Sequence, residues 1–198
     1  MEQSRLEKQF AFCLEADKEK LIQRQTLLSN GEKKENDAEH AWHMSLMCIL
    51  LSEYSNEPID VLKTISMILI HDVVEIDAGD TYAYDDKAKL SQRDRELKAA
   101  DRLFNILPDD QAKKLRALWD EFEEGETPEA RFAHTMDNIQ PAMLNNSTDG
   151  RVWKERGVRL SRILERNKNT PDGSEVLWDY SLNNFIRPNV EKGRIIED

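Results

Sequence analysis

Cysteine, glycine and proline are all scarce in this chain, and each scarcity excludes a class of protein. The 198 residues include two cysteines, Cys13 and Cys48. They have neither the CxxC spacing of a zinc ribbon nor the number needed for a disulfide framework. Reduced thiols in a cytoplasmic protein are the simpler interpretation. The seven glycines and six prolines are too few for a turn-rich β architecture, so they favour long helices.

Long uncharged runs and positive net charge are also missing. No stretch approaches the roughly 18 uncharged apolar residues of a membrane span, and the N-terminal segment lacks the apolar run of a signal peptide. We therefore expect a cytoplasmic protein without a membrane partner. The net charge of −11 argues against a nucleic acid polymer as partner, because binding its backbone needs clustered Lys and Arg. A small anion held by a metal and a few local cations remains compatible with this charge.

Apolar residues recur at helical spacing along almost the whole chain, between polar or proline-containing breaks. The pattern predicts one all-α domain over residues 1–198, a bundle of roughly eight helices. We expect a core at about 20–140, with C-terminal helices in 151–192 packed on it. Leu6, Phe10 and Leu14 mark the apolar face of the first helix, and the tryptophans, Trp42 among them, are expected in the core. The predicted helices cover about residues 5–23, 37–50, 59–76, 91–107, 108–124, 128–144, 153–167 and 175–190, with a loop over 81–91.

The stretch "ILIHDVVEIDAGD", residues 68–80, places ionisable groups directly after a strongly apolar run. Burying such groups is costly unless they are paired or bind a metal. His71 and Asp72 are adjacent and about 100° apart on a helix, so both can flank one cleft. Glu75 lies one turn farther along the same wall. Asp80 follows Gly79, which permits the chain to turn back over the cleft.

Two further segments supply candidate metal ligands. His40 lies on the preceding helix in "NDAEHAWH", and "RFAHTMDNIQP" offers Asp137. A lone helical histidine or an isolated His-Asp pair is more often structural, but the combination of three segments favours a site. Two imidazoles and two carboxylates form a mixed N/O set. Such a set suits one divalent transition metal, Mn, Co, Ni, Fe or Zn, with Mg also possible.

The order "EH" at 39–40, "HD" at 71–72, Glu75, "GD" at 79–80 and Asp137 resembles the HD-domain metal-dependent phosphohydrolases. The nearest likeness is to the 5′-deoxynucleotidase group, and it extends upstream to "LIQRQTLLSNGEKKENDAEH". The resemblance covers roughly residues 20–140. It implies an HD-domain helical bundle whose metal ligands are His40, His71, Asp72 and Asp137. His43 and His134 are not at ligand positions of the family pattern.

The resemblance also implies roles around the metal. Glu75 would orient or deprotonate the attacking water, or protonate the leaving alkoxide. Asp80 would lie near the substrate sugar or the leaving oxygen. Arg24 matches the family position of a phosphate-binding residue, and a guanidinium can bind phosphate through two parallel hydrogen bonds. Its neighbour Gln25 stands where well-studied 5′-deoxynucleotidases carry a tryptophan. We expect Gln25 to contact substrate without offering an apolar wall.

These features predict an enzyme that releases phosphate from a phosphomonoester, such as a nucleoside or deoxynucleoside 5′-monophosphate, through a metal-activated water. The resembled group also implies a homodimer. Two alternatives remain at this point. One is a phosphodiesterase or alarmone hydrolase, although alarmone hydrolases carry an acidic pair soon after "HD" and "HDVVEID" has separated acids. The other is a regulatory domain whose metal serves stability or ligand sensing, against which the presence of Arg24, Glu75 and Asp80 argues.

Overall fold

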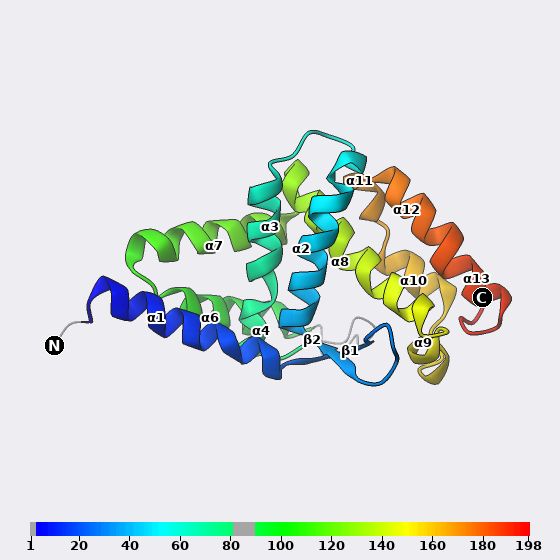
Figure 1. The fold of residues 1–198 in the computed structure, drawn as a ribbon, viewed down its shortest axis with the longest axis horizontal. Coiled ribbons are helices and arrows are strands. Elements are labelled where there is room, and N and C mark those ends of the chain that lie inside the picture. The colour runs from blue at the N-terminus through cyan, green and yellow to red at the C-terminus, as the bar shows by residue number, and fades with distance from the viewer. Residues whose placement is uncertain (1–2, 81–89) are drawn as a thin grey trace.

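Three helices from separate parts of the sequence form the centre of the fold. They are α2 (Asp37–Leu51), α3 (Val61–Ile70) and α8 (Pro128–Ser147), which cross in the middle of Figure 1. The structure, a computed structural model, describes residues 3–80 and 90–198. The predicted all-α class is confirmed, with a small hairpin added to the helices. Fully buried side chains from all three helices, among them Met44, Ile68 and Phe132, pack together as a central core.

A second group of helices lies at the N-terminal side of this centre. Besides α1 (Arg5–Ala16) it contains α4 (Glu75–Ala78), α6 (Gln92–Phe104) and α7 (Asp109–Glu124). The indole of Trp119 is fully buried among the apolar residues that α6 and α7 share. Its Nε1–H donates a hydrogen bond to the backbone carbonyl of His71 at 3.2 Å. The buried Trp119 side chain therefore helps to fix the backbone at His71, one of the predicted metal ligands.

The C-terminal segment is more broken than predicted, because short helices replace the two expected long ones. They are α9 (Arg151–Glu155), α10 (Leu160–Arg166), α11 (Thr170–Gly173), α12 (Glu175–Ser181), a π-helical turn (Leu182–Ile186) and α13 (Arg187–Glu191). Gly173 lets α11 approach α8 closely. A Cβ atom at this position would lie 2.4 Å from the carbonyl oxygen of Arg131. This close approach packs α11 against the first half of α8, and the other C-terminal helices lie on the same side of α8 (Figure 1).

The predicted first helix over 5–23 is wrong in its last part. It ends at Ala16, a 3₁₀ segment covers Asp17–Leu21, and strand β1 (Gln23–Leu27) follows. This strand pairs antiparallel with β2 (Lys34–Asn36). Helical spacing of Leu21 and Ile22 gave no signal for a strand, because a two-stranded hairpin this short has too few residues for a period of two to show.

The predicted helix over 59–76 is interrupted at the point where the ionisable residues begin. α3 ends at Ile70, a 3₁₀ turn covers His71–Val74, and α4 follows up to Ala78. A 3₁₀ segment within a helical run often marks a functional site. Gly79 then adopts a φ of +75°, which redirects the chain as its glycine predicted.

The expectation that Trp42 lies in the core is wrong. Trp42 is 66% exposed, and the apolar face of α1 is also open, with Phe10 67% exposed. In the described ranges 3–80 and 90–198, no helix is long and apolar enough to cross a membrane. The predicted loop over 81–91 falls mostly outside the described residues. That residues 1–198 form a single domain stays a prediction.

Candidate metal centre

His71 and Asp72 lie side by side on the 3₁₀ turn that follows α3, and both are buried. The Nδ1–H of His71 donates a hydrogen bond to the carbonyl of Ile68 at 2.7 Å. Nδ1 donates in the imidazolium and in this tautomer of the neutral ring alike, so Nε2 becomes the lone-pair atom once its proton is lost. Nε2 lies 3.1 Å from Oδ2 of Asp72, yet it is a buried atom without a hydrogen-bond partner in the described residues.

His40 on α2 is oriented in the same manner from the opposite side. Its Nδ1–H donates to Oε1 of Gln140 at 3.0 Å, and its Nε2 lies 3.0 Å from Oδ1 of Asp137 on α8. Gln140 is itself held by Glu35, which accepts its amide N–H at 2.6 Å. An outer hydrogen bond that fixes the tautomer is the usual companion of a metal-binding histidine. Gln140 and Glu35 carry no spacing signal in the sequence.

The donor set fits a divalent metal. Ligand atoms of His40, His71 and Asp72 all lie within 4.8 Å of one another, and the three residues are buried. Asp137 joins them from α8 through its contact with His40. The structure thus groups three of the four predicted ligands, and Asp137 adjoins this group through His40 without being part of it. That these residues hold a metal stays a prediction.

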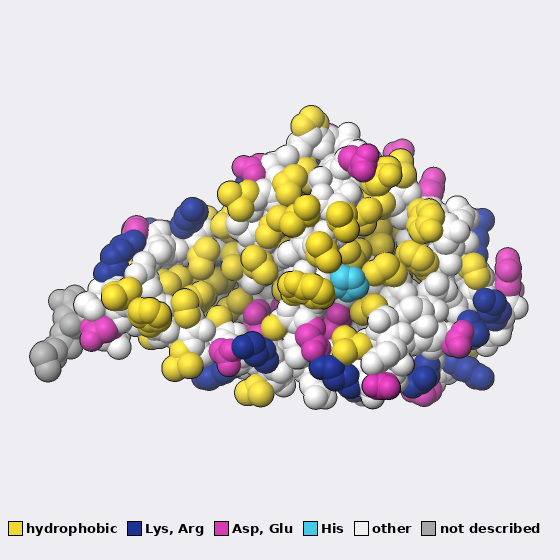
Figure 2. All heavy atoms as spheres, in the orientation of Figure 1, with side chains coloured by type: hydrophobic (Ala, Val, Ile, Leu, Met, Phe, Trp, Pro, Cys, Tyr) yellow, Lys and Arg dark blue, Asp and Glu magenta, His cyan; other side chains and the backbone are white. Residues whose placement is uncertain are grey.

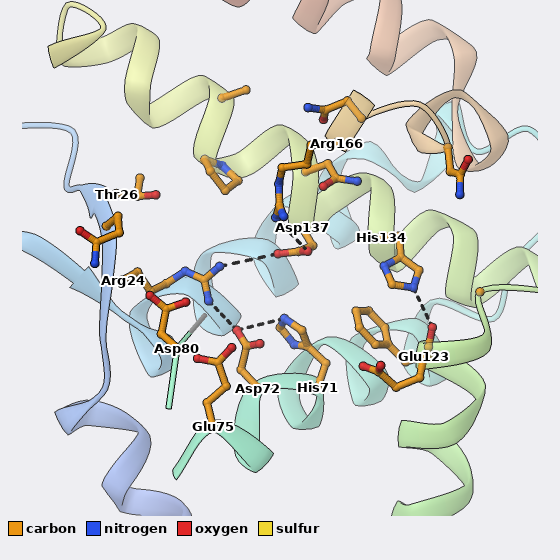
Figure 3. Close-up of a pocket in the computed structure, with 18 of the residues that line it drawn as sticks. Arg24, Thr26, His71, Asp72, Glu75, Asp80, Glu123, His134, Asp137 and Arg166 are labelled. Atoms are coloured by element: carbon orange, nitrogen blue, oxygen red, sulfur yellow. Dashed lines mark hydrogen bonds and ion pairs between the residues drawn. The ribbon is translucent and has the colours of Figure 1, made fainter. Parts of the chain in front are cut away.

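Arg24 extends from β1 into this cluster, as Figure 3 shows, and its side chain is only 12% exposed. Its Nη1 donates to Asp72 at 2.7 Å and to Asp37 at 3.2 Å, and its Nη2 lies 3.8 Å from Asp137. Although burial opposes the charged form, these carboxylates raise the pKa of Arg24 above its usual range. Asp37 was not predicted as a site residue, because its place next to Asn36 indicated only a helix cap.

Glu75 lies beside Asp72 on the wall of the cleft, and it is buried. Burial, reinforced by the charges of Asp72 and Asp37, raises the pKa of Glu75 to about 11. Its carboxyl group is therefore protonated at neutral pH in this structure. Asp80 also lines the cleft, and burial raises its pKa too. Both residues predicted to act next to the metal thus face the same space.

For the predicted ligands His71 and Asp137, neighbouring charges outweigh burial and favour the charged form of each side chain. Burial disfavours the imidazolium of His71, but the adjacent Asp72 outweighs it and raises the pKa of His71 to about 9. Burial likewise opposes ionisation of Asp137, yet the hydrogen bond with His40 and the charge of Arg166 hold its pKa well below the usual range. In the described residues, protons and guanidinium groups supply the positive charge that the two carboxylates require.

The cleft around these residues has a volume of 530 Å³, which lies within the usual range for small-ligand sites. Gln25 lines it, with its Oε1 accepting hydrogen bonds from Lys34 at 3.0 Å and from Arg156. Arg166 on α10 lines it as well, and Figure 3 shows its guanidinium directed toward Asp137. No motif in the sequence indicated Arg166, because its place depends on how the broken C-terminal helices pack.

The two remaining histidines occupy supporting positions. His134 stacks on Phe122, with ring centroids 4.1 Å apart, and its Nε2 is 2.7 Å from the carbonyl oxygen of Phe122. Burial lowers the pKa of His134. His43 contacts the amide nitrogen of Gln140 through Nδ1 at 3.1 Å. In the described structure His43 therefore touches a neighbour of His40, and His134 is bound to a backbone carbonyl.

Comparisons with known proteins identify the family of this chain. A model of the HD domain family matches residues 16–178. The chain is also similar to a predicted metal-dependent phosphohydrolase from Magnetospirillum magnetotacticum MS-1, with 43% identity and a TM-score of 0.92. That match covers 97% of this chain and 96% of the other.

Curated relatives are more distant. The 5′-deoxynucleotidase HDDC2 of Bos taurus is 28% identical over 111 residues, which are 56% of this chain and 53% of the relative. The protein of the same name from Danio rerio is 27% identical over 178 residues, 80% of this chain and 88% of the relative. The chain spans about half the length of the mammalian relatives it matches.

Metal content should depend on residues from three separate segments. Replacing any one of His40, His71, Asp72 or Asp137 by Ala removes a donor from a four-residue set, so each variant should lose most of its bound metal. His134→Ala is the matched control, since this histidine is half-buried nearby but bound to a carbonyl. Elemental analysis of the purified variants measures the result. Full occupancy in Asp137→Ala would remove Asp137 from the ligand set.

Proposed function

The chain belongs to the HD domain family, and we propose that it is a metal-dependent phosphomonoesterase acting on a nucleoside or deoxynucleoside 5′-monophosphate. The observation that carries the proposal is the convergence of two oriented imidazoles and two carboxylates beside Arg24 and Glu75 in one cleft. The names of the curated relatives and the volume of the cleft support a nucleotide-sized substrate.

The residues present divide the work of hydrolysis among themselves. His40, His71, Asp72 and Asp137 would hold a divalent metal, which supplies a Lewis acid and lowers the pKa of water. Phosphoryl transfer then requires mainly positioning and charge stabilisation. Burial raises the pKa of Glu75, which favours the protonated carboxyl group that a proton donor to the leaving alkoxide needs. Asp80 faces the cleft at the turn after Gly79, where it can accept a hydrogen bond from a sugar hydroxyl.

A diesterase or a regulatory metal domain is the competing function. Mere metal binding does not require a buried carboxyl group beside the ligands with a raised pKa, and the cleft has one in Glu75. A panel of nucleoside monophosphates, a phosphodiester and an alarmone, tested on metal-loaded protein, separates the functions. Release of phosphate from the monoesters alone supports the proposal. Turnover confined to the diester or alarmone, or no turnover at all, rejects it.

The same panel tests sugar and base selectivity. Gln25 is bound to Lys34 and Arg156, so its amide offers no flat apolar wall, and aromatic stacking contributes about 1–3 kcal/mol per base. We expect the preference for deoxy- over ribonucleoside monophosphates to stay below about 100-fold in kcat/KM. Steady-state kinetics on matched pairs measures it. A larger preference would show that selectivity arises elsewhere in the cleft.

Glu75 should serve chemistry rather than metal affinity. Glu75→Gln keeps the shape of the side chain but removes the transferable proton, so kcat should fall by about 100-fold or more, a typical loss for a general acid or base. Metal content should remain unchanged. Asp77→Asn is the matched control, because Asp77 is two residues away and pairs with Arg102 at the surface. Normal turnover in Glu75→Gln would exclude the role.

The predicted homodimer has a candidate surface. Hydrophobic side chains run across α1, α2 and α3 on the face that Figure 2 shows. This apolar face comprises Leu6, Phe10, Leu14, Trp42, Leu46, Ile49, Leu50, Leu62 and Leu69, each at least 42% exposed. Monomers rarely expose apolar patches larger than about 600 Å². Between Trp42 and Ser52 the sequence has no Lys, Arg, Asp or Glu. Two copies that meet along this part of α2 bring no charged side chain from it into the interface, and we propose a second copy as the occupant.

Sedimentation or light scattering tests this assembly. The wild-type protein should have twice the 23.1 kDa mass of one chain. Trp42→Lys and Leu50→Lys place a charge within the apolar face and should give monomers. Leu164→Lys is the control, since Leu164 is 39% exposed on α10, outside the three helices. A monomeric wild-type protein, or dimers in both lysine variants, would contradict the proposal.

A further inference from the structure

The hydrogen-bond donors of Arg24 are largely committed to carboxylates. Nη1 bonds to Asp72 and to Asp37, and Nη2 faces Asp137 at 3.8 Å. Nε is buried without a hydrogen-bond partner in the described residues. One guanidinium thus faces three acidic side chains in a nearly closed environment. A dianionic phosphate that relied on Arg24 alone would meet a cation whose charge is already offset.

Arg166 is the second guanidinium at this place, and it is less constrained. It extends from the last turn of α10, and its side chain is 30% exposed, against 12% for Arg24. The ion pair recorded for it in the described residues joins Nη2 to Oδ2 of Asp137 at 3.7 Å. That distance is too long for a hydrogen bond. Its N–H donors therefore face the cleft near Asp137 without a tight acceptor among the residues that the structure describes.

The two arginines approach different oxygens of the same carboxylate. Arg24 contacts Oδ1 of Asp137 from β1, and Arg166 contacts Oδ2 from α10. Figure 3 shows the guanidinium groups reaching Asp137 from different directions, both within the cleft. Arg166 is also close enough to stabilise the charged form of Asp80. An anion beside Asp137 would therefore lie within reach of cations from two separate parts of the chain.

We propose that Arg166 is a binding residue for the substrate phosphate, supplied by the C-terminal helices and facing Arg24 across Asp137. The proposal rests on the proposed function in its choice of a phosphomonoester as ligand. A phosphate dianion has three terminal oxygens, and guanidinium groups bind such oxygens through paired hydrogen bonds. Arg24 then serves chiefly to hold Asp72 and Asp137 in place, while Arg166 donates to the anion.

Direct binding of inorganic phosphate to metal-loaded protein tests this role without requiring a known substrate. Titration calorimetry should give a dissociation constant at least 10-fold weaker for Arg166→Gln than for the wild type. Arg166→Lys keeps the charge and should recover part of the affinity. Lys168→Gln removes the same charge two residues away, where Lys168 pairs with Glu165 and lies outside the cleft lining. It should bind phosphate normally.

Metal content and kinetics separate this role from structural support of Asp137. Arg166→Gln should keep its metal and show a higher KM for a nucleoside monophosphate with a much smaller change in kcat. Loss of metal, unchanged phosphate affinity, or a wild type that binds no phosphate would overturn the inference. Weaker phosphate binding in Arg166→Gln, combined with no nucleotide hydrolysis by the wild type, would leave the inference standing and reject the proposed function. Nucleotide hydrolysis by the wild type, combined with unchanged phosphate binding in Arg166→Gln, would support the proposed function and reject the inference about Arg166.

Discussion

The convergence of buried carboxylates on one point is the constraint on which this structure depends. Asp37 and Asp72 are almost completely excluded from solvent, and Asp137 joins them from another helix. Isolated, such charges cost several kcal/mol each to bury, and removing one partner of a buried pair typically costs about 3–5 kcal/mol. Arg24 and the Nε2 atoms of two histidines supply the compensation. Elements as distant as β1, α2 and α8 must therefore keep their relative positions.

That requirement explains local features that would otherwise weaken the fold. The helix over 61–78 gives up regular hydrogen bonding at His71 so that its imidazole and the Asp72 carboxylate reach one cleft. The break is stabilised by Trp119. Its indole N–H donates to the His71 carbonyl, which in a regular helix would accept a backbone hydrogen bond. The hairpin at Gln23–Leu27 likewise turns Arg24 inward where a continued first helix would leave it at the surface.

Local sequence patterns predicted the helical class and the order of the ionisable residues, because apolar periodicity and the His-Asp spacing are local properties. The structure groups His40, His71 and Asp72 as expected, with Asp137 adjoining them through His40, although their metal binding stays a prediction. Helical spacing failed where tertiary contacts decide. Trp42 was expected in the core because aromatic residues on a helix usually are, but its face of α2 has no covering element in the described chain.

Residues whose roles depend on distant packing left no trace in the sequence. Gln140 orients His40 through a contact 100 positions away, and Arg166 reaches the cleft from α10, where it lies near Asp137 of α8. Asp37 was hidden for another reason. It follows a residue that caps α2, and Asn36 accepts the capping hydrogen bond, so a second acid beside it indicated nothing more than a favourable helix start.

The geometry also changes the role that resemblance alone gives to Arg24. Oδ2 of Asp72 is shared between Nη1 of Arg24 and Nε2 of His71, at 2.7 and 3.1 Å. A carboxylate bound on one oxygen by a guanidinium has a fixed orientation, and its other oxygen remains available as a ligand. Arg24 would therefore position the metal ligands before any substrate arrives. A buried arginine that fixes two carboxylates has little freedom to follow a phosphate through the reaction. The negative charge of the substrate must therefore be bound by a more exposed cation, and in the described cleft Arg166 meets that requirement.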